Sequence, residues 1–256
     1  MRIAVCCKGV PVDPLIDSVS VTNGDIQFKS VDFYINEIDA YSLEAALSLK
    51  SSHKAETFAL CLGPLRTQEI LYYALAKGID QAIRIDGDVC RPELVASALN
   101  PVLKELNPQL ILVGAQSEDW MGGEVGIFLS QSLNMAHAYA VVEICELKDS
   151  HVRVKKEVGG GKKAEVVLKL PAVLCVQSGI QPLRYLSSIK RQKARNLPVK
   201  VAGKFDLEGA KKQISAMAAY EVKGVIPPVK DRHAVMIEGD RLEKSGKVLE
   251  IITKAR

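Results

Sequence analysis

The sequence predicts an α/β fold: a mostly parallel sheet with helices on both faces. Two observations lead to this prediction. Short apolar runs alternate with helical patterns through the first half of the chain, which is typical of βαβ units. In addition, 48% of the 256 residues are apolar, which is enough for one large core.

The expected elements of the first half follow in order. The first helix places Leu43 and Leu47 on one apolar face. Gly78 ends the second helix, in the left-handed conformation that glycine tolerates there. Pro101 indicates a kink or a break in the third. Strands are expected at 2–7, 57–62, 81–85 and 109–113, and helices at 39–50, 68–77, 92–106 and 127–133.

The pattern changes after about residue 139. Four consecutive strands are expected at 141–147, 152–158, 164–170 and 172–176, with three glycines at 159–161 as a turn. This predicts an antiparallel hairpin extension added to the parallel sheet. Residues 205–256 form a C-terminal arm with a break at Pro227-Pro228 and a final amphipathic stretch. The arm is too small for its own core, so we expect it to wrap around something larger.

A glycine-rich loop at 114–126 connects a predicted buried strand to a helix. Such a loop presents backbone N–H groups and a positive helix end, which suit a phosphate. Its spacing is neither G-x-G-x-x-G nor that of a P-loop, because no Lys-Ser/Thr pair follows the glycines. From the residues alone, the loop is either a nucleotide site or a strand-to-helix turn that needs small residues for packing.

Other candidate residues lie where predicted strands end. Asp13, Asp39 and Asp119 follow strands or begin helices, and Gly63-Pro64 follows another strand. Ligands bind at the carboxyl ends of strands in open parallel sheets. Asp39 and Asp119 could equally be helix caps. The chain shows no pattern of nucleophile and base, so we predict no catalytic residue and a nucleotide that is held rather than transformed.

The remaining composition narrows the function classes. The six cysteines show no C-x-x-C motif and the four histidines are scattered, so we expect buried reduced thiols and no metal site. No apolar run reaches the length of a membrane span, and the chain enters a strand at once. We therefore expect a cytoplasmic protein without membrane insertion.

The segment 177–204 is basic, and no acidic residue occurs between Lys169 and Asp206. It could be a solvated surface, a docking site for an acidic partner, or a nucleic-acid site. Tyr185 is its only aromatic residue, which disfavours nucleic acid.

At this point the residues resemble a family: the β subunits of electron-transfer flavoproteins, especially the FixA-like branch. The resemblance runs in order across nearly the whole chain, which makes it more specific than any single motif. The matching positions are 3–11, Asn36, 39–50, 62–64, 74–80, Gly114, Gln116, Asp119, Gly126, 154–160, 168–173, 184–185, 193–195 and a short tail strand at 235–240.

The resemblance implies an adenine-nucleotide alpha-hydrolase-like domain over 1–204 and an arm at 205–256 that wraps an α partner subunit. In such heterodimers FAD lies chiefly in the α subunit, and the β subunit holds AMP, or FAD in the bifurcating branch, which also uses NADH. The implied nucleotide-binding residues are Cys7, Lys8, Asn36, Asp39, Gly63, Gly114, Gln116, Asp119, Gly122, Gly123, Glu124, Val125 and Gly126.

The resemblance also implies that the basic segment docks a redox partner of acyl-CoA dehydrogenase type. The implied docking residues are Arg184, Tyr185, Leu186, Ile189, Lys190, Arg191, Lys193 and Arg195. The chain departs from the family pattern at Trp120-Met121, at Glu124 and at Ser188-Ile189, so Ile189 or Leu186 is the expected aliphatic anchor.

Three hypotheses remain from the sequence. The leading one is a non-catalytic electron-carrier subunit, whether by simple transfer or by bifurcation. The alternatives are an enzyme that activates or hydrolyses a nucleotide on the same sheet and a structural adapter. An enzyme of that kind needs a base or a metal beside the phosphates. The 114–126 loop offers only Glu118, Asp119 and Glu124, and no lysine.

Overall fold

A computed structural model describes residues 1–12, 19–22, 25–28, 32–89, 91–214 and 236–254. The chain divides into two compact units, 1–225 and 226–256. Several residues on which the sequence analysis relied lie outside the described residues: Asp13, Pro227, Pro228, one of the six cysteines (Cys90) and the first residue of the expected tail strand (Val235).

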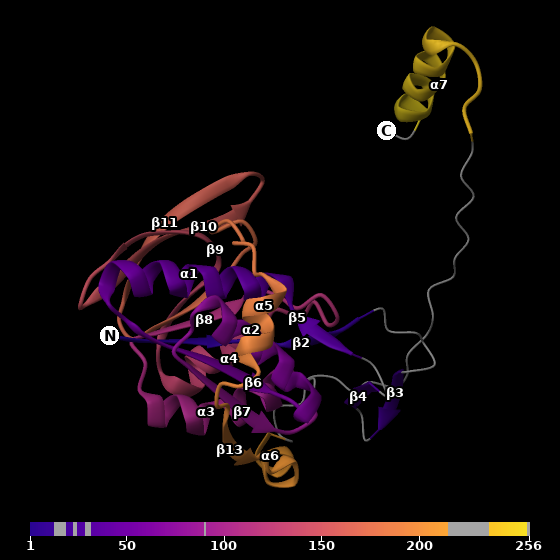
Figure 1. Cartoon of the computed structure of the whole chain (residues 1–256). Coiled ribbons are helices and arrows are strands. Elements are labelled where there is room, and N and C mark those ends of the chain that lie inside the picture. Colours follow the sequence, from indigo (N-terminus) through magenta and orange to yellow (C-terminus); the bar gives the residue numbers. More distant parts are fainter. Residues whose placement is uncertain (13–18, 23–24, 29–31, 90, 215–235, 255–256) are drawn as a thin grey trace. The chain divides into compact units, whose positions relative to one another are not determined.

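The first unit is built on a nine-stranded sheet (Figure 1). Its central strands are parallel and buried, and they are continuous apolar runs because helices cover both faces. The strand order across the sheet is β11 (Lys162–Lys169), β10 (His151–Gly159), β9 (Ala136–Leu147), β12 (Ala172–Val176), β8 (Leu110–Gly114), β1 (Arg2–Cys6), β6 (Glu56–Leu62), β7 (Gln81–Asp86) and β13 (Lys200–Lys204).

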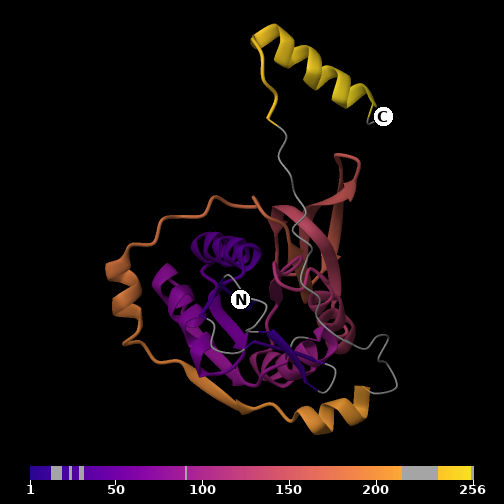
Figure 2. The same ribbon diagram turned by 90° about the vertical axis from the view of Figure 1, so that its right-hand side faces the viewer.

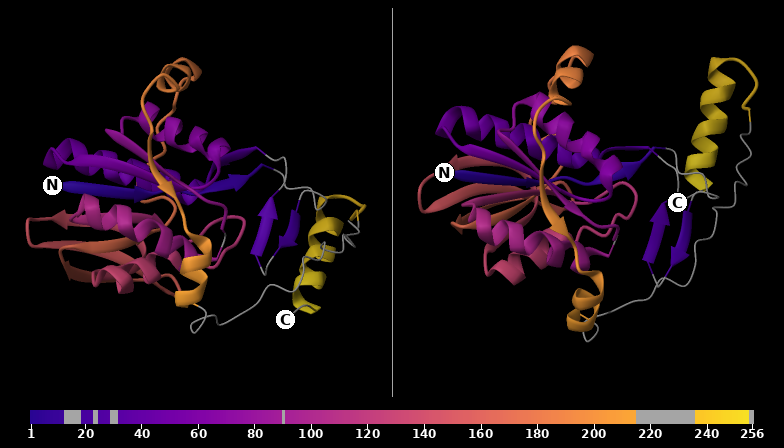
Figure 3. Two further views of the ribbon diagram at one scale, coloured as in Figure 1. Left: turned by 90° about the horizontal axis from the view of Figure 1, so that it is seen from below. Right: turned by 60° about the horizontal axis from the view of Figure 1, so that its bottom comes forward.

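Two pairs of helices enclose this sheet, as Figure 3 shows. The helices α1 (Glu37–His53) and α2 (Gln68–Lys77) share one core cluster, and α3 (Pro92–Leu106) and α4 (Val125–Leu133) share the other. Neighbours in β1 alternate between the faces: Val5 packs in the first cluster and Ala4 in the second. The predicted α/β fold with helices on both faces is confirmed.

Helix α3 continues through Pro101, so the proline does not end the helix. The proline lies on an exposed face of the helix, where water can solvate the carbonyl that loses its N–H partner. At its other end, α3 begins with Pro92 at the first helical position, where proline's missing N–H costs nothing.

The antiparallel extension is confirmed for β9, β10 and β11. The fourth predicted strand, β12, instead runs parallel between β8 and β9. It is buried along its whole length and therefore belongs to the parallel core. The turn from β10 to β11 uses Gly159, Gly160 and Gly161, all with positive φ, a sequence of conformations that other residues adopt only with strain.

The chain after β12 crosses to the opposite edge of the sheet (Figure 2). It forms α5 (Ser188–Ala194) against α2, then β13 parallel to β7, then α6 (Leu207–Ile214) against α3. We call residues 177–204 the strap. The sequence analysis missed β13 because all its residues are exposed and it carries no apolar alternation.

The smaller elements of the first unit were also not predicted. They are two antiparallel pairs, β2 (Gly9–Pro11) with β5 (Phe33–Ile35) and β3 (Val19–Thr22) with β4 (Asp25–Phe28), and a short 3-10 helix, η2 (Leu65–Thr67).

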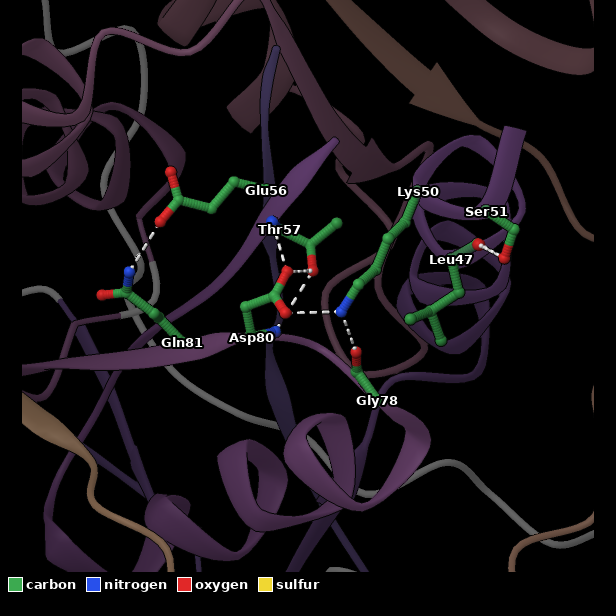
Figure 4. A network of polar contacts seen from close by, with 8 residues as sticks. All are labelled: Leu47, Lys50, Ser51, Glu56, Thr57, Gly78, Asp80 and Gln81. Atoms are coloured by element: carbon green, nitrogen blue, oxygen red, sulfur yellow. Dashed lines mark hydrogen bonds and ion pairs between the residues drawn. The ribbon is translucent and has the colours of Figure 1, made fainter. Parts of the chain in front are cut away.

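A polar network holds the amino-terminal ends of β6 and β7 to α1 (Figure 4). The Lys50 ammonium lies 2.5 Å from Asp80 Oδ1, and Asp80 Oδ2 accepts bonds from the Thr57 N–H and hydroxyl at 2.9 and 2.8 Å. Since ligands bind at the carboxyl ends of parallel strands, we assign this network a structural role.

In the second unit the described residues form one helix, α7 (Arg241–Lys254), which contains the amphipathic stretch noted in the sequence. Asp240 Oδ1 accepts from the N–H groups of Leu242 and Glu243, and the Glu243 carboxylate accepts from the Asp240 N–H. This reciprocal pair is a capping box. Residues 236–240 form no strand, so the tail strand expected there is wrong for the described part.

Candidate nucleotide-binding cleft and docking segment

A cleft opens at the carboxyl ends of β1, β6 and β8. In the sheet, β6 lies beside β1 and β7 lies beside β6, whereas the next strand in the chain, β8, lies on the other side of β1. The strand order therefore reverses between β1 and β8. In open α/β sheets such a switch point is where ligands bind.

Asp39 joins the two strands at the switch point. Its Oδ2 accepts from the backbone N–H of Lys8, after β1, at 2.8 Å, and its Oδ1 accepts from the N–H of Gly114, at the end of β8, at 2.9 Å. The alternative that Asp39 is a helix cap is wrong, because the N-cap of α1 is Asn36. Burial raises the pKa of Asp39 to about 7, against the opposing effect of these hydrogen bonds and of the Lys8 charge.

Asn36 fixes the start of the glycine-rich loop. It is 1% exposed, and its side-chain amide donates to the Gln116 carbonyl at 3.0 Å while its Oδ1 accepts from the Glu118 N–H at 3.1 Å. The Glu118 carboxylate in turn accepts from the Tyr34 hydroxyl and from the Glu37 N–H. The loop is thus tied to the entrance of α1 by side chains on both sides.

Lys8 brings a cation into the cleft. Its ammonium lies 2.7 Å from Asp119 Oδ1 and donates to Ser117 Oγ at 3.2 Å. Asp119 is no helix cap either, since α4 begins six positions later with Glu124 as its N-cap. The Lys8 side chain is 31% exposed and lines the cleft.

The amino terminus of α4 faces the same cleft. Glu124 makes no side-chain cap, and within the described part of the chain no hydrogen bond reaches the N–H groups of residues 122–126. Unsatisfied N–H groups at a helix start favour an anion. Gly123 has φ +67, and a Cβ there would lie 2.5 Å from the Tyr139 hydroxyl, so only glycine lets the loop approach this closely.

The structure brings most of the predicted nucleotide-binding residues together. Those that line the cleft are Cys7, Lys8, Asn36, Asp39, Gly114, Gln116, Asp119, Gly123, Glu124 and Val125. Gly63, Gly122 and Gly126 do not line it. They are close-packing positions: a Cβ at Gly63 would lie 2.5 Å from Thr67 Oγ1, and one at Gly126 would lie 2.4 Å from Cys175 Sγ.

Sequence reasoning missed an apolar wall of the cleft. It is formed by the end of β6 and the start of α3, and its side chains are Leu60, Leu62, Pro92, Val95 and Leu99. Phe33 and Trp120 add aromatic surface to the lining. The wall could not be predicted, because Leu60 and Leu99 belong to a core cluster and follow core periodicity in the sequence. Such a surface suits a flat ring.

The arginines of the strap hold it to the helices. Arg184 Nε lies 2.6 Å from Glu44 Oε2, and Arg195 lies 2.9 Å from Glu69 Oε2. The Arg191 guanidinium lies 5.7 Å from the centre of the Tyr73 ring. Three of the predicted docking residues are therefore engaged within the chain.

The other predicted docking residues face outward. Tyr185 is 90% exposed and Ile189 is 65% exposed, whereas Leu186 is half-buried. Ile189 is therefore the more accessible of the two expected anchors. Lys190 and Lys193 are exposed and make no ion pair within the described residues. The strap thus presents an apolar tip with two lysines beside it.

The cysteines and the possible metal ligands of the described residues form no further site. The described cysteines are free, and all but Cys145 are buried. Burial raises the pKa of Cys61 to about 11 and that of Cys175 to about 12, so these thiols stay protonated. In the described residues, no group of His, Cys, Asp and Glu side chains could hold a metal ion. No described helix has both the length and the apolar character that a membrane span requires.

Comparisons with known proteins agree with this geometry. A family model described as "Electron transfer flavoprotein domain" matches residues 26–206. The chain is 32% identical over 238 residues to the electron transfer flavoprotein subunit beta of Methylophilus methylotrophus, covering 90% of this chain and 89% of that one. It is 28% identical over 239 residues to a probable subunit beta of Saccharomyces cerevisiae, covering 90% and 91%. It is 31% identical over 197 residues to the subunit beta of Bradyrhizobium diazoefficiens, covering 74% and 78%.

Proposed function

The chain belongs to the β subunits of the electron transfer flavoprotein family, and we propose that it pairs with an α subunit to carry electrons between a dehydrogenase and an acceptor. The dehydrogenase we propose is of acyl-CoA dehydrogenase type. The likeness to β subunits over 90% of the chain supports a carrier. So does the exposed apolar and basic tip of the strap, which fits a partner with an acidic rim.

We further propose that the cleft holds an adenine nucleotide. The observation that carries this proposal is the convergence of the uncapped α4 terminus and the Lys8 ammonium on one switch-point cleft. The N–H groups of residues 122–126 would bind a phosphate, Lys8 would balance its charge, and the wall around Leu60 and Leu99 would receive the base. AMP and FAD share these groups.

The flavin of the complex supplies the electron-transfer chemistry, and we assign it chiefly to the α subunit. The residues of this chain bind, orient and exclude water. Asp39 and Asn36 hold the loop that faces the phosphate, and both are engaged in hydrogen bonds within the chain. Of the loop acids, Glu118 accepts from Tyr34 and from the Glu37 N–H, and Asp119 is paired with Lys8. This engagement supports a holding role over nucleotide hydrolysis, which needs a base free to activate water.

A second candidate is a bifurcating carrier with FAD in the cleft and NADH as donor. Trp120 favours it, because an indole on the cleft lining offers a stacking surface for an isoalloxazine ring. This candidate corresponds to the FixA-like branch and places a redox-active ring, rather than a silent nucleotide, against the 119–126 loop.

The test is the nucleotide content of the complex. We would co-express the chain with its α subunit, release bound nucleotides in acid and quantify them by chromatography. One FAD and one AMP per heterodimer would support the simple carrier, and two FAD the bifurcating one. A stable complex with nothing beyond the α-subunit FAD would refute the nucleotide proposal, and release of phosphate at more than a few turnovers per hour would refute the holding role.

A pair of variants tests whether the second nucleotide binds in this cleft. Lys8→Met should lower the occupancy of the second nucleotide while one FAD per complex remains. Lys104→Met is the control, since Lys104 is exposed on α3 away from the lining residues. Equal nucleotide loss in both variants would show that Lys8 has no particular role.

A further inference from the structure

A cluster of three charges lies where the strap meets the helices: Glu44 and Lys77 are buried, and Arg184 is exposed. Glu44 comes from α1, Lys77 from the last turn of α2 and Arg184 from the strap. Lys77 Nζ lies 2.7 Å from Glu44 Oε1, and these two side chains are only 4% and 3% exposed. Charges this deeply buried are expensive unless they are well paired. Burial raises the pKa of Glu44, but bonds from Lys77 and Arg184 outweigh it and hold the pKa below its usual range.

Glu44 and Lys77 bind the backbone of Arg184 as well as its side chain. Glu44 Oε1 accepts from the Arg184 backbone N–H at 3.1 Å, and Glu44 Oε2 accepts from Arg184 Nε at 2.6 Å. Lys77 Nζ also donates to the Arg184 carbonyl oxygen. Both backbone polar groups of Arg184 are therefore fixed by residues 140 and 107 positions away.

The stretch that follows Arg184 is exposed, and it is fastened again further on. Tyr185 and Ile189 project from it. At its far end, Ala194 is buried and Arg195 pairs with Glu69. The tip carrying Tyr185 and Ile189 is thus a short segment that is fixed at both ends. At its first end, Arg184 is held by the buried carboxylate of Glu44.

We propose that Glu44 and Lys77 form a latch that orients the strap tip for docking of the redox partner. In this role Glu44 is a positioning residue that acts through Arg184. The inference rests on the proposed carrier function. A tip held in its binding geometry spares the partner the entropy of ordering it, so losing the latch weakens docking while leaving the electron-transfer step itself intact.

The test uses the complex with its α subunit and an acyl-CoA dehydrogenase reduced by its acyl-CoA substrate. In Glu44→Gln we expect the KM for the dehydrogenase to rise about tenfold with kcat within about twofold of wild type. Amide hydrogen exchange over 185–194 should accelerate, and the nucleotide content should stay unchanged.

A second variant guards against misfolding, because Glu44→Gln leaves the Lys77 ammonium buried without a counter-charge. The double variant Glu44→Gln with Lys77→Met removes both charges and the latch together, and it should show the same rise in KM and in exchange. Glu143→Gln is the matched control: it breaks the exposed ion pair with Lys155 between β9 and β10, outside α1, α2 and the strap, and should change neither quantity.

Wild-type exchange over 185–194 in the double variant would overturn the latch. Faster exchange with an unchanged KM would overturn its role in docking. If the wild-type complex passes no electrons to the dehydrogenase, the proposed carrier function fails instead, and the exchange measurement still decides whether the latch exists.

Discussion

The Asp39 carboxylate accepts a hydrogen bond from the backbone N–H of Gly114 at 2.9 Å, although the two residues are 75 positions apart. The other carboxylate oxygen binds the N–H of Lys8. One side chain in the first turn of α1 therefore ties together the ends of β1 and β8, between which the cleft opens. The shape of the cleft depends on this buried group.

Asp39 should make the stability of the protein depend on pH. Burial raises its pKa to about 7, whereas an aspartate in the unfolded chain titrates near 3.9. The folded state therefore binds the proton more tightly. The resulting stability is fully present below about pH 4 and is lost as pH rises through 7. Asp39→Asn removes this titration.

We would measure urea unfolding of the wild-type and Asp39→Asn complexes at pH 5, 6, 7 and 8. The difference in unfolding free energy, wild type minus variant, should increase by about 1 kcal/mol for each pH unit as the pH falls from 7 to 5. Asp149→Asn, an exposed position, should follow wild type. A difference that stays flat over this range would mean that Asp39 is ionised throughout.

Gly126→Ala should displace α4 from the sheet. A Cβ at this position would lie 2.4 Å from Cys175 Sγ and 2.7 Å from Val113 Cγ2, both in the core. We expect the unfolding free energy to fall by about 1–3 kcal/mol and the second nucleotide to be lost. Gly246→Ala, with nothing within 4 Å in an exposed helix, should be neutral or slightly stabilising. Full stability and nucleotide content in Gly126→Ala would contradict the packing argument.

Lys193→Glu should slow association with the electron donor. The lysine is exposed and carries no internal ion pair among the described residues, so its charge acts on the approaching partner. We expect the second-order rate constant of reduction to fall about tenfold at low ionic strength and to approach wild type at high salt. Stopped-flow reduction across a salt series measures this. Lys104→Glu makes the same charge change on α3, and an equal effect there would show that the strap has no special part.

Asp80 should have the opposite pH dependence from Asp39. Burial raises its pKa, but hydrogen bonds from Lys50 and Thr57 outweigh burial and hold the pKa below its usual range. The stability that Asp80 contributes is therefore present above about pH 4 and is lost as pH falls through its folded-state pKa.

Asp80→Asn should cost about 1 kcal/mol at pH 7, since the Asp80 side chain is 37% exposed and its ion pair is partly screened. Thermal unfolding at pH 7 and at pH 3.5 should show that this cost shrinks at the lower pH. A cost that grows on acidification would reverse the assignment of Asp80 as a stabilising anion.

The central strands and their helices could be predicted closely, because burial on both faces leaves a continuous apolar run such as β12. The edge strand β13 could not, since it pairs on one side only and all its residues are exposed. The site divides in the same way. Asp39, Asp119 and the loop that begins at Gly114 could be placed together because carboxyl ends of parallel strands converge. Asn36 came only from the family resemblance, and Leu60 and Leu99 have the pattern of ordinary core residues.

The basic strap shows a second limit of sequence reasoning. A count of arginines and lysines cannot separate charges that face solvent from charges paired inside the fold. Arg184 and Arg195 find their carboxylates 140 and 126 positions away, on α1 and α2. Only the folded chain shows that these arginines fasten the strap while Lys190 and Lys193 are exposed to solvent.

The strap leaves the sheet after β12 and rejoins it at β13, so it passes over the four strands β8, β1, β6 and β7 without being one of them. Its outward tip lies between the fastenings at Arg184 and Arg195. Residues 185–193 can therefore be replaced as one segment without replacing the residues that fasten the strap. From the docking role proposed above, we expect that grafting that stretch from a relative transfers the choice of redox partner and leaves the candidate cleft unchanged.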